Sequence, residues 1–380
     1  MALLIDGHCH PVLASDVDEP AFARWCTEAD QPAPPGVSYL DSQLGLAVRR
    51  WCPPVLGLAA HAPIGEYVAR RAELGWRAAS SALLRAAGLG ALLVDTGLDG
   101  EELVDPATLG ELAGASAHEV VRLERVAETL PGLVDAADFA EVYQAELAVR
   151  VAGAVAVKSI VAYRFGLELP PERPGPAEVR RAAGEWFGAG RPRLTDPVLL
   201  RFVLWSGVDT GLPVQLHTGF GDRDVALRRA DPAHLQPFVA ATESTGVPLV
   251  LLHCYPYQRS AGWLALVYPH VYLDVGLTMN HLGAGVHSGL REFFELAPFG
   301  KLLFSTDAYG LPELYQAGAA QFRHALRRLL DGWLADDAMS TVDAERIVAA
   351  VGAGNARRLY RLPDRSARAG SAGPDSLGRA

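Results

Sequence analysis

The chain has few of the features that mark secreted, membrane-spanning or nucleic-acid-binding proteins. Its 380 residues include only four cysteines, whose spacing fits neither a zinc finger nor a disulfide-rich scaffold, so we expect free thiols. Long basic runs are absent and the net charge is −10, which argues against nucleic acid and anionic membranes as partners. No uncharged segment approaches the roughly 20 residues that span a bilayer, and no signal-peptide pattern opens the chain. These absences favour a cytoplasmic protein that acts on a small molecule. They are also compatible with a protein that forms a homo-oligomer.

What the chain does contain is a series of short apolar runs separated by stretches with helical patterning. We expect strands at residues 2–5, 91–94, 119–123, 155–158, 213–216, 249–252, 271–274 and 302–305, and helices at 138–151, 197–210, 232–245 and 313–334. Apolar strands that alternate with helices favour parallel βαβ units. Eight such strands predict the α/β class and a (β/α)8 TIM barrel. A doubly wound sheet is the alternative, but it would not naturally place functional groups at so many strand ends around one centre.

The first two strands are too far apart for a simple crossover. We therefore expect a helical insertion at about residues 15–90, covering the barrel mouth. The barrel itself is expected to extend over residues 1–362. Residues 363–380 are rich in Ser, Gly, Ala and Arg, a composition that predicts a disordered tail.

Residues that can bind metal or move protons follow the predicted strands. His8 and His10 come directly after the first strand, and their spacing places both imidazoles on one face. In a barrel of this kind, chemistry sits at the carboxyl ends of the strands. Six groups follow five strands: His8, His10, Lys158, His217, His253 and Asp307. Any one of them has an ordinary explanation, such as a helix N-cap for the aspartate, but their conjunction predicts a metal centre.

This order, His-x-His, Lys, His, His, Asp, resembles that of the amidohydrolase superfamily, and the resemblance extends from Leu3 to Leu362. More narrowly, residues 157–164, 215–222 and 253–257 resemble the amidohydrolase-2 branch. Within that branch they are similar to the domain found fused to glutamine-synthetase-like modules. Residues 272–277, 304–308 and 354–360 fit the same picture. No such module follows in this sequence, so we expect the barrel alone.

The resemblance implies a metal-dependent amidohydrolase, with His8, His10, His217 and Asp307 as ligands of a divalent metal. Zinc is the expected ion, although manganese and iron suit the same ligands. The ion would lower the pKa of a bound water molecule, Asp307 would move its proton, and His253 would hold the water or polarise the substrate carbonyl. One ion is favoured. Two become possible if Lys158 is carbamylated and bridges them.

Four residues are candidates for substrate binding. Lys158 and Arg164 together suit a substrate carboxylate, Gln215 shares the inward parity of His217, and Tyr255 follows the sixth strand. The leading function is hydrolysis of the C–N (amide) bond of a small carboxylated substrate, and the resemblance makes a γ-glutamyl amide a candidate. A metal-dependent, non-oxidative decarboxylase of a small carboxylic acid is the alternative. A non-catalytic binding barrel is a third hypothesis.

Overall fold

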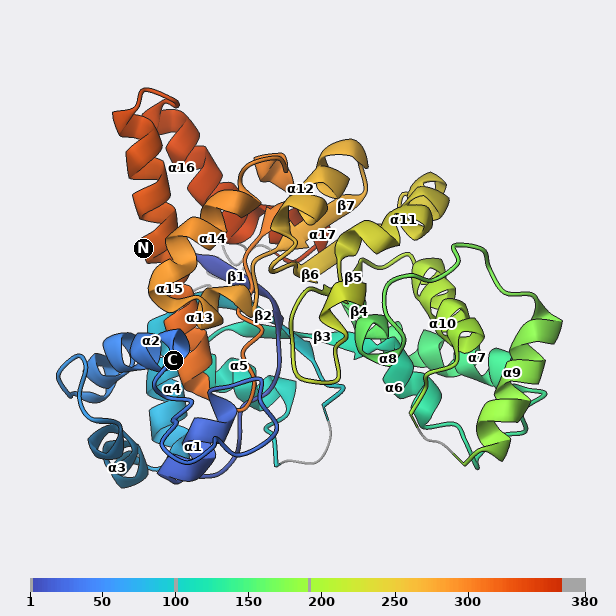
Figure 1. The fold of residues 1–380 in the computed structure, drawn as a ribbon, viewed down its shortest axis with the longest axis horizontal. Helices are drawn as coiled ribbons and strands as arrows, with labels where there is room; N and C mark the ends of the chain where they lie inside the picture. Colours follow the sequence, from blue (N-terminus) through green and yellow to red (C-terminus); the bar gives the residue numbers. More distant parts are fainter. Residues whose placement is uncertain (1–2, 99–101, 191–192, 364–380) are drawn as a thin grey trace, which may run out of the picture.

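The computed structural model describes residues 3–98, 102–190 and 193–363, so nearly all of the expected tail lies outside the described residues. Eight parallel strands follow one another around the sheet in chain order (Figure 1). They are β1 Leu4–Cys9, β2 Leu89–Asp95, β3 Ser116–Arg122, β4 Ala156–Ser159, β5 Val214–Thr218, β6 Leu249–His253, β7 Val271–Asp274 and β8 Leu302–Leu303. Each expected strand is present. β3 begins earlier than predicted and β8 is only two residues long.

The sheet closes through hydrogen bonds between β1 and the segment that follows β8. Gly7 donates its backbone N–H to the Phe304 carbonyl at 3.0 Å, and Asp307 donates to the His8 carbonyl at 3.0 Å. The paired histidines and Asp307 are therefore held side by side by the main chain, although about 300 residues separate them. The predicted (β/α)8 TIM barrel is confirmed.

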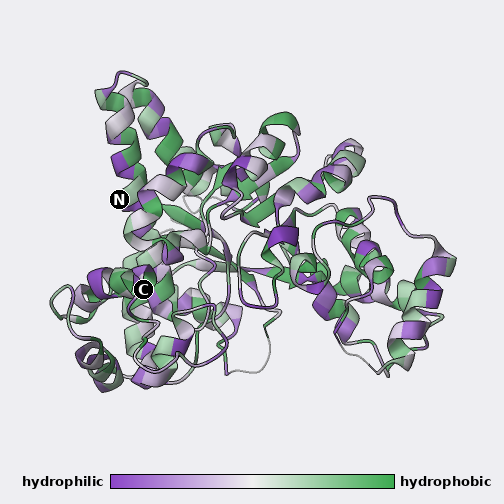
Figure 2. Cartoon of the chain, in the orientation of Figure 1, coloured by the Kyte–Doolittle hydropathy of each residue, from purple (hydrophilic) through white to green (hydrophobic). Residues whose placement is uncertain are grey.

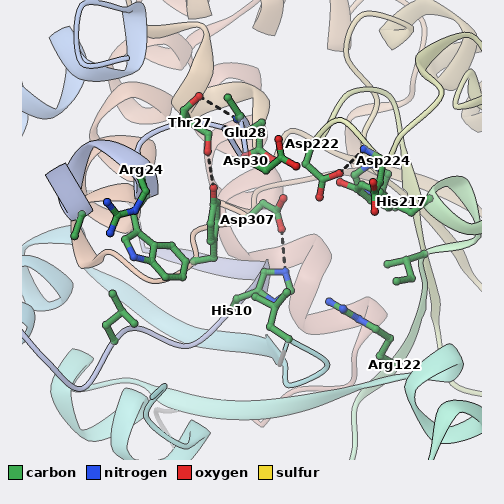
Figure 3. A pocket seen from close by; sticks show the side chains of 18 of the residues that line it. His10, Arg24, Thr27, Glu28, Asp30, Arg122, His217, Asp222, Asp224 and Asp307 are labelled. Atoms are coloured by element: carbon green, nitrogen blue, oxygen red, sulfur yellow. Dashed lines mark hydrogen bonds and ion pairs between the residues drawn. The ribbon is translucent and has the colours of Figure 1, made fainter. Parts of the chain in front are cut away.

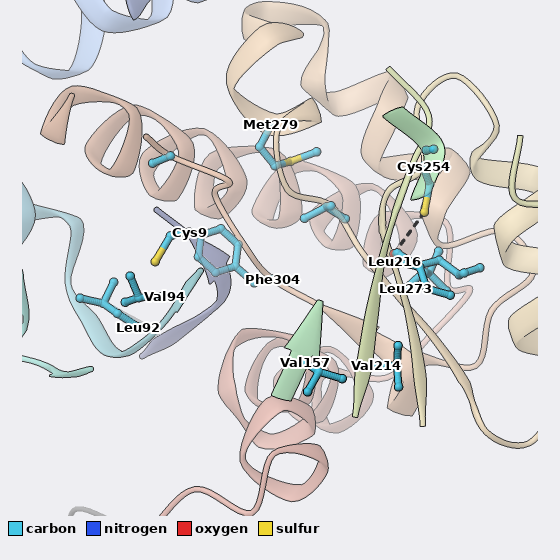
Figure 4. Packing of buried hydrophobic residues seen from close by; sticks show 14 of the residues in the cluster. Cys9, Leu92, Val94, Val157, Val214, Leu216, Cys254, Leu273, Met279 and Phe304 are labelled. Carbon is cyan, nitrogen blue, oxygen red and sulfur yellow. Dashed lines mark hydrogen bonds between the residues drawn. The ribbon is translucent and has the colours of Figure 1, made fainter. Parts of the chain in front are cut away.

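Alternating side chains build two apolar layers. One layer packs inside the barrel, where it contains Ile5, Leu93, Val250 and Leu303 and is joined by residues of η7 (Ala350–Gly354) and α17 (Asn355–Leu359). The other layer lies between the strands and the surrounding helices and includes Val157, Val214, Leu216 and Leu273 (Figure 4). Because apolar side chains fill the amino-terminal part of the barrel, polar side chains concentrate at the carboxyl ends of the strands.

Helices surround the strands and alternate apolar and hydrophilic residues along their length, as expected when one face packs on a barrel (Figure 2). After β2 they are α5 Pro106–Ala113, α6 Leu123–Glu128, α7 Phe139–Val151, α8 Val161–Arg164, α9 Pro176–Gly188, α10 Pro197–Asp209, η2 Leu227–Arg229, η3 Pro232–Leu235, α11 Gln236–Thr242, η4 Glu243–Thr245, α12 Gln258–Val267, α13 Thr278–His281, η5 Gly283–Gly285, α14 Val286–Phe293, η6 Phe299–Lys301, α15 Pro312–Ala335 and α16 Thr341–Ala349. The predicted helices near 138–151, 197–210 and 313–334 are confirmed. The stretch at 232–245 is divided into η3, α11 and η4.

The long connection between β1 and β2 is a helical insertion, as the sequence predicted. It contains α1 Glu19–Trp25, α2 Gln43–Trp51, η1 Pro53–Leu56, α3 Ile64–Leu74 and α4 Trp76–Ala87. Its helices α2 and α4 lie beside α15 (Figure 1). A buried ion pair fixes this packing, since Arg71 Nε lies 2.7 Å from Glu313 Oε1 and the Tyr67 hydroxyl donates to the same oxygen at 2.8 Å.

Two further expectations can be compared with the fold. All four cysteines are free and buried. Among the described residues, no helix combines the length and apolarity needed to cross a bilayer. A second excursion, between β4 and β5, adds α8 and α9 before α10 and was not singled out from the sequence.

Candidate metal centre

Three predicted ligands converge at the barrel mouth. The ligand atoms of His8, His10 and Asp307 all lie within 4.8 Å of one another, and all three residues are buried. His8 Nε2 is 3.1 Å and His10 Nε2 is 3.5 Å from Asp307 Oδ1. This spacing brings two imidazole nitrogens and one carboxylate oxygen around a single point.

The second nitrogen of each imidazole is already engaged. His8 Nδ1 lies 2.9 Å from Gln215 Oε1, and His10 Nδ1 lies 3.0 Å from the carbonyl oxygen of Asp95. Both partners are hydrogen-bond acceptors, so each Nδ1 carries a proton and each Nε2 is the nitrogen left to bind a metal. Support of this kind, in which the outer nitrogen bonds to a fixed acceptor, is usual for metal-binding histidines.

The charges of these groups also suit a cation. Burial lowers the pKa of His8 to about 4, so the imidazole is neutral near pH 7. Burial alone would raise the pKa of Asp307, but the neighbouring histidines, His253 first, outweigh it and hold that pKa well below its usual value. The neutral imidazole of His8 therefore faces an ionised carboxylate, whose Oδ1 has no hydrogen-bond donor. The donor set fits a divalent metal.

His253 and His217 flank this group. His253 Nε2 lies 3.5 Å from Asp307 Oδ2, and the rings of His217 and His253 are 4.6 Å apart. His217 lies outside the close group of His8, His10 and Asp307, although its Nε2 is buried and has no hydrogen-bond partner. Its predicted role as a fourth ligand stays a prediction.

The backbone is unusual at both predicted catalytic residues. His253 has φ 68° and Asp307 has φ 49°, and neither is glycine. A left-handed conformation costs about 1–2 kcal/mol for such residues and is concentrated at functional sites. The fold therefore stabilises a strained backbone at these two positions.

Lys158 reaches the same centre from the end of β4. Its Nζ lies 2.7 Å from His8 Nε2 and 3.7 Å from Asp95 Oδ2. Burial lowers the pKa of Lys158. The nitrogen that His8 offers to a metal is thus also within reach of the lysine, so the state of Lys158 is coupled to metal binding.

The remaining predicted substrate contacts divide into two groups. Lys158 and Arg164 line a cavity over the centre, whereas Gln215 and Tyr255 do not. Gln215 is fully buried behind His8, where its Nε2 donates to the Gly7 carbonyl at 2.7 Å and to the Tyr360 hydroxyl at 2.9 Å. This geometry gives Gln215 a positioning role in place of the expected substrate contact.

Tyr255 packs edge-on against Phe220, with ring centroids 5.8 Å apart. The positive φ angles of His253 and Cys254 turn the chain immediately after β6. Because of this turn, Tyr255 is not among the residues that line the cavity, although it follows a strand end.

The sequence analysis did not predict an ion pair that lies at the ends of β2 and β3. Arg122 Nη2 lies 2.7 Å and Nε lies 3.1 Å from Asp95 Oδ2. Burial would raise the pKa of Asp95, but Arg122 outweighs it and the net pKa is well below the usual value. Asp95 thereby supports His10 through its carbonyl and stays charged beside Lys158. The strand-end rule that found the histidines would also have found this pair.

The cavity has a volume of about 1080 Å³ and opens over the metal centre, with His10, Lys158, His217 and Asp307 in its wall. Loops after α1 and after β5 enclose it from above (Figure 3). Its charged lining has both signs: the carboxylates include Glu28, Asp30, Asp222 and Asp224, and the cations include Arg122, Arg164 and Arg193. These loop residues were not predicted, because no strand or helix pattern marks them.

A TIM barrel with paired histidines at the end of its first strand and an aspartate after its last defines the class of metal-dependent barrel enzymes. The amidohydrolase family matches residues 5–362, and the chain belongs to this family. Protein fluG of Emericella nidulans (strain FGSC A4) is 34% identical over 223 residues, which cover 55% of this chain and 26% of that protein. The aligned part therefore spans about a quarter of that relative.

Two solved structures show how far the similarity extends. A protein of Lactobacillus casei ATCC 334 described as a metal-dependent hydrolase has a TM-score of 0.82 and 28% identity, covering 95% of this chain and 96% of that one. A uronate isomerase from Bacillus halodurans C-125 has a TM-score of 0.64 and 14% identity, covering 97% of this chain and 95% of that one. The second likeness shows a shared fold and nothing about the reaction.

Proposed function

We propose that this protein is a metal-dependent amidohydrolase that cleaves the C–N bond of a small carboxylated substrate. One observation carries the proposal: the ligand atoms of His8, His10 and Asp307 lie within 4.8 Å of one another beside a charged cavity, with each Nδ1 held by an acceptor. The similarity to the Lactobacillus casei protein supports hydrolysis, since that protein is described as a metal-dependent hydrolase.

In this proposal, His8, His10 and Asp307 hold one divalent ion, and His217 is the candidate fourth ligand. When bound, the ion lowers the pKa of water and polarises the scissile carbonyl. Zinc is the proposed ion, and manganese or iron would suit the same donors. A two-metal centre would need Lys158 to be carbamylated. The lowered pKa of Lys158 favours the neutral amine, the form that reacts with carbon dioxide.

The chain's own groups move the protons. Asp307 accepts a proton from the attacking water and delivers it to the departing nitrogen, so that water and amide become a carboxylic acid and an amine. His253 Nε2, 3.5 Å from Asp307 Oδ2, is positioned to orient the water or the carbonyl oxygen. Because burial lowers the pKa of His253 to about 3, it acts as a neutral imidazole near pH 7.

A carboxylate on the substrate is supported by the cations of the cavity. Arg164 contacts Glu128 at 3.0 Å through Nη2, while its buried Nε has no hydrogen-bond partner. An arginine N–H that is buried and unpaired is costly, and a substrate carboxylate would satisfy it. The resemblance to domains joined to glutamine-synthetase-like modules places γ-glutamyl amides first among the candidates.

The test is a screen of protein reconstituted separately with zinc, manganese and iron. Simple amides, γ-glutamyl amides and aromatic acids are supplied, and amine and carbon dioxide release are both followed. We expect amine release that is lost in Asp307→Asn. Carbon dioxide release without amine would support the decarboxylase instead, and ligand binding without turnover would support a binding barrel.

A further inference from the structure

Two carboxylates that line the cavity, those of Glu28 and Asp222, have no lysine or arginine as an ion-pair partner among the described residues. Glu28, in the loop after α1, has a buried Oε1 that accepts no hydrogen bond, and its closest charged neighbour is His281 Nε2 at 3.4 Å. That contact is an ion pair only when His281 is protonated. Asp222, an exposed residue in the loop after β5, accepts a hydrogen bond from the backbone N–H of Asp224 at 2.8 Å but forms no ion pair with any residue that the structure describes. Figure 3 shows both side chains above Asp307.

These two groups belong to one electrostatic site. Both side chains line the same cavity, and partial burial, with the charges of Asp224 and Glu28, raises the pKa of Asp222. Their neighbours on the rim are already neutralised: Asp224 pairs with Arg193 at 2.7 Å, and Asp30 lies 3.6 Å from Arg223. Only Glu28 and Asp222, of these four acids, lack a permanent cation.

The loop that carries Asp222 is fixed against the predicted metal-site residues. A side chain at Gly221 would collide with the Tyr163 hydroxyl and touch the His217 ring, so only glycine permits this close approach. His217 is 3% exposed and presents an Nε2 without a hydrogen-bond partner to the same cavity. Unsatisfied groups at this end of the cavity indicate that ligand atoms belong there.

A positively charged side chain lines the same cavity. Arg164, which follows Tyr163 directly, lines the cavity and leaves its Nε unpaired. The cavity thus offers carboxylates without an ion-pair partner, Glu28 and Asp222 among them, and a guanidinium, that of Arg164, whose Nε has no acceptor. A ligand that satisfies both must carry a positive and a negative group.

We propose that Glu28 and Asp222 bind a primary ammonium group of the substrate while Arg164 binds its carboxylate. The substrate is then an amide whose far end is a free α-amino acid, and its scissile carbonyl lies at the metal centre. This inference rests on the proposed function, and it narrows the substrate from a carboxylated amide to a zwitterionic one. The same amide without its amino group would leave two carboxylates unpaired and should be rejected.

The experiment compares L-γ-glutamyl-p-nitroanilide with glutaryl-p-nitroanilide, which lacks only the α-amino group. For the metal-loaded wild type, we expect kcat/KM to favour the γ-glutamyl compound by about a hundredfold. Glu28→Gln and Asp222→Asn should each lower kcat/KM for that compound by about tenfold, mainly through KM, and so reduce its advantage over the glutaryl compound. Asp30→Asn is the matched control, because Asp30 lines the cavity but is already paired, and should stay within about twofold.

Equal rates for the two anilides, or equal effects of Asp222→Asn and Asp30→Asn, would overturn the inference and leave the hydrolase proposal standing. If neither anilide is cleaved, the hydrolase proposal fails for these amides, and binding decides the inference. L-Glutamine should then raise the melting temperature of the wild type more than glutaramate does, and Asp222→Asn should abolish the difference. No difference between these ligands in the wild type would overturn the inference as well.

Discussion

Replacing Gln215 with leucine removes the support of a predicted metal ligand without changing any atom that faces the cavity. The substitution leaves the His8 Nδ1 proton, the Gly7 carbonyl and the Tyr360 hydroxyl without their present partners. Each unsatisfied buried group costs about 1–3 kcal/mol, so we expect the free energy of unfolding to fall by about 3–5 kcal/mol, with some relief from rearrangement. Loss of the bond that orients a metal-binding histidine typically weakens metal affinity by about 10- to 100-fold.

A matched variant separates the loss of His8 positioning from a general loss of stability. Gln215→Glu keeps an oxygen that accepts from His8 Nδ1 but loses the donor to the Gly7 carbonyl, so it should lose stability and retain zinc affinity. Urea unfolding of the metal-free protein measures the stability, and competition with a chelator measures the affinity. Wild-type zinc affinity in the leucine variant would refute the reasoning, and so would equal losses of affinity in both variants.

Two further predictions concern buried charges away from the metal centre. Burial raises the pKa of Glu124, so its contribution to stability is complete at low pH and is lost as the pH rises through the folded-state pKa. Glu124→Gln should therefore gain stability relative to the wild type as the pH rises above about 4, and a difference in urea unfolding that does not change with pH would contradict this. Arg71→Met leaves the buried carboxylate of Glu313 without its ion-pair partner and should lower the free energy of unfolding by about 3–5 kcal/mol. The double variant that adds Glu313→Gln should recover part of this loss. A loss below about 1 kcal/mol in the single variant would show that this ion pair does not fasten the insertion to α15.

The barrel and the core of the site could be predicted because both follow from strand alternation. Apolar runs separated by helices predicted parallel strands, and the carboxyl ends of parallel strands meet at one mouth. His8, His10 and Asp307 therefore had to converge whatever the intervening sequence. The same rule, applied to the second and third strands, would have identified Asp95 and Arg122.

Other features depend on three-dimensional packing that the sequence does not encode locally. The alternation of side chains along the strand placed Gln215 inside the barrel. Its partner, His8, is 207 residues away in the chain, and their contact depends on how the His8 ring is oriented. Tyr255 follows a strand end, yet the left-handed turn at His253 and Cys254 directs it onto Phe220. Glu28 and Asp222 lie in loops, where no periodicity marks residues that face the cavity.

The most direct test of the central claim is a metal titration of chelator-treated protein, with bound metal and amide hydrolysis measured on the same samples. The claim is that His8, His10 and Asp307 form a divalent-metal centre on which hydrolysis depends. We expect activity to rise in proportion to bound zinc in the wild type and reach its maximum near one equivalent, while Asp307→Asn neither retains the ion nor recovers activity. Full hydrolysis by metal-free wild-type protein, or unchanged metal binding and activity in Asp307→Asn, would contradict the account.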